Sequence, residues 1–368
     1  MQRIKVGIIG QGRSGRNIHR HLFETVPKLM ERYEVVAVAD PIPERTAPSN
    51  PGASAACKRY SDYRELLKDP NVELVVNASR SLQHVRVSKE AMEAGYNVIS
   101  EKPLARTVAD ADSVFETARR TGRFFAVFQQ SRFRPVFTKA LELANSGILG
   151  RIIMVKIIYN GFDFRSDWQT VQDMCAGSLL NTGPHPLDQA LQFYGDADPE
   201  HVLCLMDNVN SYGDAEDHVK LLLYGKGHPT IDLEASSCQL YNPYIYQIYA
   251  SRGSLVATNT EVDWKYCIKE ELPENHLKLD TLEGAGRLPT YSGGPSPIYY
   301  ENKWNPPIDN CGFDYMGSIY YQNIYEAILH GAPLKVTWEQ VRRQIAVIEE
   351  CHRQNPLPKT VKVDPLTM

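Results

Sequence analysis

A glycine-rich turn near the N-terminus constrains the fold of this chain more than any other feature. Residues 10–15 read Gly-Gln-Gly-Arg-Ser-Gly, a G-x-G-x-x-G pattern, and directly follow the apolar run 4–9. A short apolar run that ends in glycine is typical of a strand buried on both faces of a parallel sheet. The next residues, 14–32, carry apolar side chains at roughly helical spacing, and Pro27 is expected to kink or split this helix. Strand, glycine turn and helix together predict a dinucleotide-binding unit.

Each glycine of this turn has its own physical task. Gly10 permits the tight turn, Gly12 lets a pyrophosphate approach the backbone, and Gly15 allows the helix to pack closely on the strand. The phosphates would then lie at the positive end of the helix dipole, where we also expect Arg13 and Ser14 to contribute.

Asp40 ends the second predicted strand, residues 34–39. A carboxylate at this place accepts hydrogen bonds from the adenosine ribose hydroxyls and repels a 2′-phosphate. We therefore expect NAD as the cofactor. NADP is the less favoured alternative, because Arg45 is close enough in sequence to reach a 2′-phosphate.

Strand-like and helical segments alternate as far as residue 128, with strands at 74–78, 97–100 and 124–128 and helices at 84–94 and 108–121. Beyond a helix at 135–145 the character changes, because strand-like segments then follow one another with short turns at 152–159, 219–223, 230–235, 244–250 and 253–258. The pattern predicts an α/β protein: a Rossmann parallel sheet in domain 1–128, and in domain 129–368 an α+β fold with an open, mostly antiparallel sheet.

The end of the chain predicts a loop and two helices. Residues 283–310 are rich in Gly, Pro, Tyr and Asn and lack a clean period, which indicates a long loop or insertion. Helices are expected at 315–329 and 338–355, and the last is placed to pack back on the first domain. The second domain would bind the substrate and mediate oligomerisation.

The composition indicates an ordinary globular protein with a small-molecule partner. The apolar fraction is 43%, the charged fraction 23% and the formal net charge −4, without a long basic block, which argues against nucleic acid or an anionic membrane as partner. No apolar run approaches the roughly 20 residues needed to cross a bilayer, and the first residues do not resemble a signal peptide. Seven scattered cysteines without a C-x-x-C pair fit neither a disulfide framework nor a zinc site. We expect a cytoplasmic protein without a bound metal.

Several motifs in order resemble those of the Gfo/Idh/MocA family of oxidoreductases, named from glucose-fructose oxidoreductase and inositol dehydrogenase. Besides the glycine turn and Asp40, they are Ala78-Ser79 leading to His84, Glu101-Lys102-Pro103, Arg132-Phe133, Ser146-Gly147-x-x-Gly150 and Gly177-x-x-x-Asn181-x-Gly183-x-His185-x-x-Asp188. The resemblance covers essentially the whole chain. It implies a cofactor site formed by Gly10, Gly12, Arg13, Ser14, Gly15, Asp40, Ser79, His84, Glu101 and Lys102.

The resemblance also implies that Lys102, Asn181 and His185 line the catalytic cleft. Many members of the family have Asp at position 181, and the Asn of this chain departs from that pattern. An amide can fix the orientation of a histidine ring but supplies no charge, so we expect a lower pKa for His185. Asp188 lies one helical turn after His185 and could partly replace the missing carboxylate.

The chemistry of these residue types agrees with the resemblance. Oxidising a secondary alcohol requires a group that takes the hydroxyl proton, and histidine titrates in the right range. Lys102 would polarise the substrate oxygen or relay the proton itself. Without the resemblance, Lys102 would be interpreted as a solvent-exposed lysine. His185, which lies between two prolines, would be interpreted as a structural residue of a turn.

The substrate site is less well determined. Arg165 and Trp168 would hydrogen-bond or stack on a sugar, with a surface arginine and a core tryptophan as the alternative, and Asp188 is a further substrate-binding candidate. His19 and His21 have no partners at metal-ligand spacing.

These observations favour an NAD-dependent dehydrogenase that oxidises a secondary hydroxyl of a sugar, a glycoside (at C3 as a special case) or a cyclitol. Two alternatives are a redox-neutral, NAD-dependent glycosidase and a non-catalytic NAD-binding regulator. The open sheet predicts a homo-oligomer.

Overall fold

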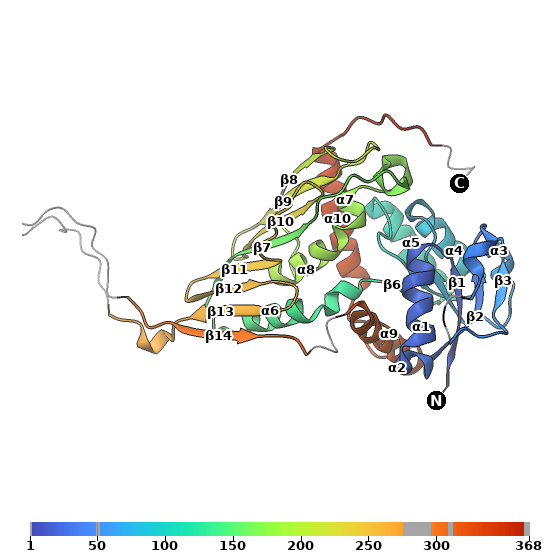
Figure 1. The fold of residues 1–368 in the computed structure, drawn as a ribbon, viewed down its shortest axis with the longest axis horizontal. Coiled ribbons are helices and arrows are strands. Elements are labelled where there is room, and N and C mark those ends of the chain that lie inside the picture. The colour runs from blue at the N-terminus through green and yellow to red at the C-terminus, as the bar shows by residue number, and fades with distance from the viewer. Residues whose placement is uncertain (1, 49, 51, 275–295, 308–311, 364–368) are drawn as a thin grey trace, which may run out of the picture.

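The computed structural model describes residues 2–48, 50, 52–274, 296–307 and 312–363. It contains two sheets, one in each half of the chain, with helices packed between and around them (Figure 1). This arrangement confirms the predicted fold class, an N-terminal parallel sheet followed by a mostly antiparallel one.

The N-terminal sheet has six parallel strands in the order β3-β2-β1-β4-β5-β6. The strands are β1 Ile4–Ile9, β2 Tyr33–Ala39, β3 Lys58–Tyr60, β4 Leu74–Asn77, β5 Asn97–Ser100 and β6 Phe125–Val127. The sequence did not predict β3, because this three-residue edge strand reads Lys-Arg-Tyr and has no apolar pattern. The order reverses direction beside β1, so the carboxyl ends of β1 and β4 open a crevice suited to a dinucleotide.

Helical segments connect these strands: the π-helical turn η1 Gly15–Arg20, α1 His21–Thr25, α2 Pro27–Met30, α3 Tyr63–Leu66, α4 His84–Glu93 and α5 Val108–Thr121. Val26 is extended, which separates α1 from α2, as the proline at position 27 predicted. Helix α5 begins where the Thr107 side chain accepts a hydrogen bond from the Asp110 N–H and ends at the left-handed Gly122.

The second sheet has eight strands in the order β14-β13-β12-β11-β7-β10-β9-β8, and only the β7–β10 pair is parallel. Their bounds are β7 Ile152–Asn160, β8 His201–Asp207, β9 His218–Tyr224, β10 Thr230–Ser236, β11 Tyr246–Ala250, β12 Gly253–Ala257, β13 Val262–Tyr266 and β14 Tyr300–Trp304.

Strand β14 corrects part of the loop predicted for 283–310, while residues 283–295 and 308–310 lie outside the described residues. Its sequence, Tyr-Glu-Asn-Lys-Trp, has no buried residue, and it pairs only with β13 at the sheet edge. Such a polar edge strand leaves no period-2 apolar signal.

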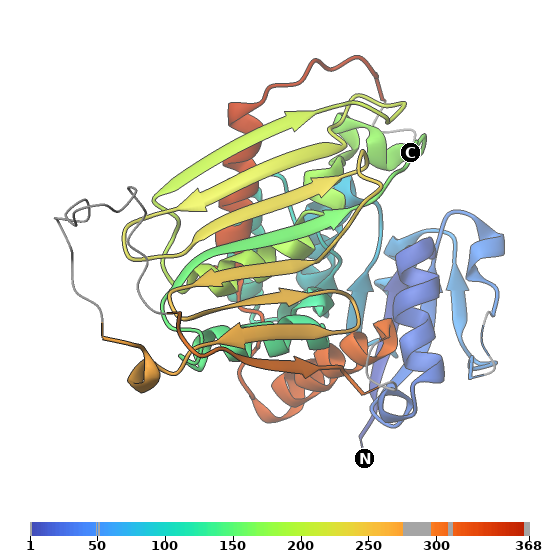
Figure 2. The same cartoon turned by 60° about the vertical axis from the view of Figure 1, so that its left-hand side comes forward.

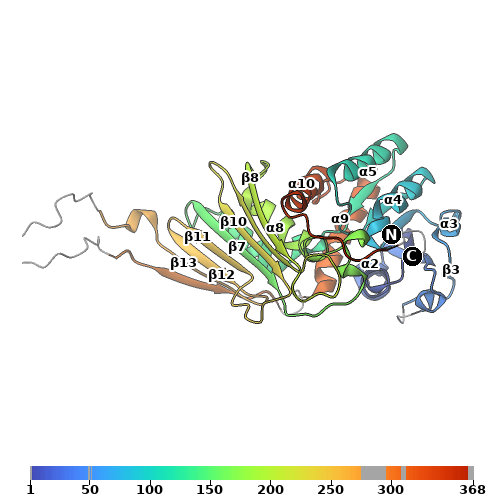
Figure 3. The same cartoon turned by 90° about the horizontal axis from the view of Figure 1, so that it is seen from above.

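Helices cover one face of this sheet and leave the other open, as Figures 2 and 3 show. The covering helices are α6 Pro135–Asn145, α8 Pro184–Tyr194 and α10 Trp338–Gln354. Helix α9 Phe313–His330 instead buries Tyr320 and Tyr321 against the first domain. Helix α10 packs on both domains, with Ile345 in the core of the first and Ile348 in the core of the second.

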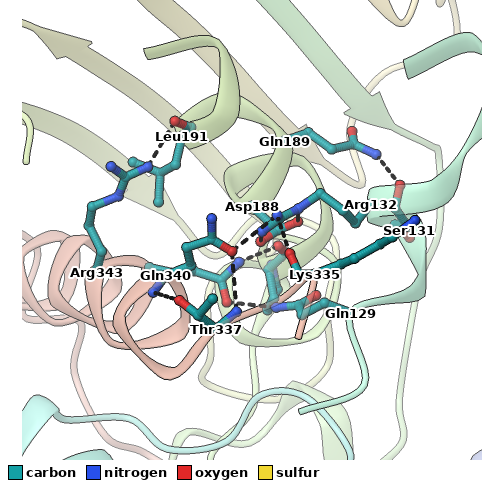
Figure 4. Close-up of polar contacts among 12 residues, drawn as sticks. Gln129, Ser131, Arg132, Asp188, Gln189, Leu191, Lys335, Thr337, Gln340 and Arg343 are labelled. Carbon is teal, nitrogen blue, oxygen red and sulfur yellow. Dashed lines mark hydrogen bonds and ion pairs between the residues drawn. The ribbon is translucent and has the colours of Figure 1, made fainter. Parts of the chain in front are cut away.

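A buried ion pair joins the chain after β6 to helices α8 and α10 (Figure 4). Arg132, on the 3₁₀ turn η4 Gln130–Phe133, donates to both oxygens of Asp188 at 2.6 and 2.5 Å. Its remaining terminal nitrogen donates to the Lys335 carbonyl and to Gln340 Oε1. The two side chains are 8% and 5% exposed, so this buried contact fixes α8 to the segment that follows β6.

Replacing Asp188 by Ala should lower the free energy of unfolding by about 3–5 kcal/mol, because the Arg132 guanidinium would remain buried without its counter-charge. Urea-induced unfolding followed by tryptophan fluorescence measures the loss. The matched control is Asp112→Ala, which breaks the exposed pair with Arg342 and should cost at most about 1 kcal/mol. Equal losses in the two variants would contradict this account.

Candidate active site

The glycine turn forms a cradle at the carboxyl end of β1. Gly10 has a φ of +84°, and a Cβ there would collide with the Ala78 carbonyl oxygen. A Cβ at Gly15 would collide with the carbonyl oxygen of Gly10, whereas one at Gly12 would have no atom within 4 Å. Two of the glycines are therefore needed for close packing, while Gly12 borders open space. That space at the start of the helical turn η1, next to Arg13 and Ser14, fits the pyrophosphate of a dinucleotide.

Asp40 lies where the ribose of such a cofactor is expected. Its carboxylate is 4% exposed and accepts hydrogen bonds from the Gln11 N–H at 2.7 Å and the Ile42 N–H at 2.9 Å. Arg45 does reach this position, with its guanidinium 4.0 Å from Asp40 Oδ1 and its side chain 48% exposed. The carboxylate of Asp40, held by two backbone N–H groups, is suited to accept hydrogen bonds from ribose hydroxyls. The long, half-exposed side chain of Arg45 is the group that would face a 2′-phosphate.

Ser79 and His84 shape the loop after β4. Ser79 Oγ donates to Asn77 Oδ1 at 2.6 Å, while the two ring nitrogens of His84 lie 2.7 Å from the Pro103 carbonyl and 3.1 Å from the Ser79 carbonyl. Burial lowers the pKa of His84, and the two carbonyls oppose that shift. His84 thus ties the Ser79 loop to the Lys102–Pro103 peptide, which is cis, and protein groups engage both of its nitrogens.

Glu101 points into the protein rather than into the open cradle. One carboxylate oxygen is 3.1 Å from His19 Nε2, and the other accepts a hydrogen bond from the Lys102 N–H. His19 Nδ1 lies 2.7 Å from the Tyr321 hydroxyl of α9. Burial alone would raise the pKa of Glu101, but His19 and the Lys102 ammonium lower it to about 2. Both carboxylate oxygens of Glu101 thus have protein partners, and one of them is the backbone of Lys102, while a contact of Glu101 with the cofactor stays a prediction.

Lys102 reaches from the first domain to the second. Its Nζ donates a hydrogen bond of 2.7 Å to the carbonyl oxygen of Asn181, at the end of the short helix α7 Ser178–Asn181. Burial lowers the pKa of Lys102, Glu101 opposes that shift, and Arg13 and Arg165 reinforce it. The ammonium therefore lies in a partly buried, cation-rich environment.

The Asn181 side chain belongs to a second polar chain. Its Oδ1 accepts a hydrogen bond from Gln169 Nε2 at 3.2 Å, and Gln169 Oε1 in turn accepts one from Arg165. Arg165 also pairs with Asp167 at 2.8 Å. Gln169 lies on the 3₁₀ turn η5 Trp168–Thr170, beside the half-buried Trp168, and was not predicted as a site residue. Arg165 is thus within electrostatic range of Lys102, and the role of Arg165 and Trp168 in binding a substrate stays a prediction.

His185 is the second residue of α8, one turn beyond Asn181. Its Nδ1 atom is buried and has no hydrogen-bond partner among the described residues. The pKa of His185 lies well below 6.5, because burial and the charges of Lys102 and Arg134 disfavour the imidazolium, with only Glu101 opposing them. The ring is therefore neutral at pH 7, and its surroundings make it a weaker base than a free imidazole.

The hydrogen bonds of the Asn181 and Asp188 side chains are made to groups other than the His185 ring. Asn181 does not fix the imidazole ring, since its side-chain oxygen is bound by Gln169. Both oxygens of Asp188 accept hydrogen bonds from Arg132, and its role in binding a substrate stays a prediction. The pKa of His185 is low, as expected, but burial and two cations are the cause.

A polar cavity of about 350 Å³ adjoins these residues at Thr182. It lies at the carboxyl end of β7 and is lined by Arg134, Tyr159, Asn160, Asn242 and Asn259 among others. A wider groove of about 700 Å³ runs over α4 and the start of α5. Neither Lys102 nor His185 lines either space, and only the smaller one includes a residue, Thr182, that lies between Asn181 and His185 in the sequence. Among the described residues there is no cluster of three His, Cys, Asp or Glu side chains that could hold a metal ion.

The described helices include none that is both long and apolar enough to cross a bilayer.

Substituting Gly12 by Ala should leave folding intact but weaken binding of NADH by about tenfold or more, because the methyl group enters the space left for the pyrophosphate. NADH fluorescence titration gives the dissociation constant. Gly312→Ala is the matched control, since a Cβ there also meets no atom within 4 Å but lies at the start of α9. Equal affinities of both variants and the parent protein would contradict this assignment.

The low pKa of His185 can be measured by NMR titration of protein with ¹³C-labelled histidine. Lys102→Met should raise the pKa of His185, because a positive charge that disfavours the imidazolium is removed. The remote Arg151→Gln variant removes an exposed positive charge and should leave that pKa unchanged. A pKa of His185 at or above 6.5 in the parent protein would refute the electrostatic account.

Two family models match the chain. Residues 4–129 match the oxidoreductase family with an NAD-binding Rossmann fold, and residues 137–256 match the GFO/IDH/MocA C-terminal domain. Together they cover the first sheet and the second sheet as far as β12, whereas β13 and β14 lie beyond the matched residues.

Named relatives cover nearly the whole chain at low identity. A scyllo-inositol 2-dehydrogenase (NADP⁺) of Bacillus subtilis is 26% identical over 369 residues, which is 98% of this chain and 96% of the relative. A levoglucosan dehydrogenase of Pseudarthrobacter phenanthrenivorans is 24% identical over 388 residues and covers 95% of both chains. The solved structure of a levoglucosan dehydrogenase with NADH and levoglucosan has a TM-score of 0.74 at 19% identity, over 96% of this chain and 98% of the other, which shows a shared fold.

Proposed function

The chain belongs to the Gfo/Idh/MocA family of oxidoreductases, and we propose that it is a dehydrogenase that oxidises a secondary hydroxyl of a sugar, glycoside or cyclitol with NAD. The observation that carries this proposal is the hydrogen bond of Lys102 to the Asn181 carbonyl, one turn before His185. Lys102 lies at the end of β5, in the domain that also contains a dinucleotide cradle. The named relatives act on inositols and levoglucosan, which supports the same class of substrate.

The chemistry that a bound NAD supplies is acceptance of a hydride from the carbinol carbon. Lys102 would donate a hydrogen bond to the hydroxyl oxygen, while its contact with the Asn181 carbonyl holds the ammonium in place. His185 would accept the hydroxyl proton, because its ring is uncharged at neutral pH. The polar chain of Arg165, Gln169 and Asn181 would keep this edge of the cleft fixed.

The cofactor is proposed to be NAD rather than NADP. The buried Asp40 carboxylate supports this choice, because it would repel a 2′-phosphate. Arg45 favours the alternative, and the Bacillus relative is named as an NADP⁺ enzyme. Rates measured with both nucleotides decide between them.

The substrate is proposed to lie against the polar cavity at the end of β7. Tyrosine and asparagine side chains line this cavity, and such groups hydrogen-bond sugar hydroxyls while an aromatic ring packs on their C–H faces. One special case is a glycoside that is oxidised at C3. Its aglycone would then point toward this cavity.

The open face of the second sheet is proposed to pair with another copy of the chain. It exposes apolar side chains on its outermost strand, Leu203 at 47% and Leu205 at 61%. Apolar groups on an uncovered sheet favour burial in a symmetric interface.

A panel of sugars, methyl glycosides and cyclitols, followed by the absorbance of NADH, tests the proposed activity. At least one compound should reduce NAD⁺, and Lys102→Ala should lower kcat by about 10²- to 10⁴-fold while NADH still binds. Lys226→Ala, at an exposed site far from the cradle in the sequence, serves as the control and should keep full activity.

Failure of every compound at every pH to reduce NAD⁺ would refute the dehydrogenase. Glycoside cleavage without net NADH would instead indicate a redox-neutral glycosidase.

A further inference from the structure

Two arginines that are two residues apart have opposite environments. Arg132 is buried and uses its guanidinium on Asp188, Lys335 and Gln340. Arg134 lines the 350 Å³ cavity beside Thr182, and it is the only Arg, Lys, Asp, Glu or His among the residues that line it. The cavity therefore contains one positive charge and no negative one.

The guanidinium of Arg134 is held in place without being neutralised. Its Nη1 donates to Asn259 Oδ1 at 3.0 Å, and its Cζ lies 5.1 Å from the centroid of the Tyr159 ring. In the part of the chain that the structure describes, no carboxylate lies within ion-pair distance of it. Glu234, a carboxylate behind this wall, is engaged by Asn160 and Lys220. Arg134 is thus oriented by neutral groups, with most of its N–H donors uncommitted.

Arg134 lies close enough to the catalytic residues to act on the same small molecule. After burial and Lys102, its charge is among the causes that lower the pKa of His185, which places it within electrostatic range of that ring. The cavity also includes Thr182, the residue that follows Asn181. A group bound at Arg134 would therefore belong to the sugar that is oxidised or to its immediate substituent.

We propose that this cavity binds a carboxylate of the substrate through Arg134, so that the sugar oxidised is a hexuronic acid or a glycoside of one. The inference rests on the proposed dehydrogenase function and narrows its substrate class. A planar guanidinium matches a carboxylate with two parallel hydrogen bonds. The amides of Asn160, Asn242 and Asn259 around it are suited to the ring hydroxyls of the same molecule.

Matched pairs of sugars test the inference. The pairs are D-glucose and D-glucuronate, D-galactose and D-galacturonate, and D-mannose and D-mannuronate, each also as its methyl glycoside. Binding to the NADH-loaded protein is measured by isothermal titration, and oxidation by reduction of NAD⁺. At least one uronate should bind about 10- to 100-fold more tightly than its hexose and show a correspondingly higher kcat/KM.

Three variants distinguish the effect of the Arg134 charge on binding from a general effect on folding. Arg134→Gln should abolish the preference for the uronate while NADH binding remains, and Arg134→Lys should keep part of it, because a point charge replaces the planar donor pair. Arg151→Gln removes an exposed arginine at the other end of the β7 segment and should leave the preference unchanged. Binding of the hexose 6-phosphates is measured in the same way, because a phosphate is an anion that Arg134 could also bind.

Equal affinity for hexose and uronate in all pairs, a preference that survives Arg134→Gln, or tighter binding of a 6-phosphate than of the uronate would each overturn the inference. Rapid oxidation of neutral sugars with no preference for the acid would overturn it while leaving the dehydrogenase intact. Arg134-dependent binding of a uronate without any NADH formation would support the carboxylate site and refute the dehydrogenase.

Discussion

The hydrogen bond from Lys102 to the Asn181 carbonyl is the contact on which the site depends. It joins the end of β5 in the parallel sheet to α7 in the second domain, so one side chain spans the cleft. The same ammonium is, after burial, the largest cause of the low pKa of His185. Moving Lys102 would therefore change both the proposed hydrogen-bond donor to a substrate oxygen and the pKa of His185.

Buried polar groups hold both sides of this contact. On the first domain, Tyr321, His19 and Glu101 form a chain that ends at the Lys102 N–H, so α9 supports the loop from behind. On the second domain, Arg132 and Asp188 fix α8, which carries His185. Unsatisfied buried charges are costly, so each chain resists displacement of the loop or helix that it holds. The last two helices thus contribute to the site without lining it.

What the sequence predicted correctly was local. The glycine turn, the carboxylate at the end of β2 and the split helix at Pro27 follow from backbone requirements within a few residues. The choice of side-chain partners was not predictable in the same way. Asp188 and Glu101 looked like groups facing a ligand, but Arg132 and His19 engage them from segments 56 and 82 residues away. Strands β3, β8, β13 and β14 escaped prediction. All but β13 lie at a sheet edge, where a strand needs little apolar pattern.

A crystal structure with NAD⁺ and a bound sugar tests the central claim, that Lys102 and His185 act on one hydroxyl beside the nicotinamide. The account predicts that Lys102 Nζ and a ring nitrogen of His185 both lie within about 2.6–3.2 Å of the same substrate oxygen. A substrate whose reacting hydroxyl contacts neither residue would contradict it.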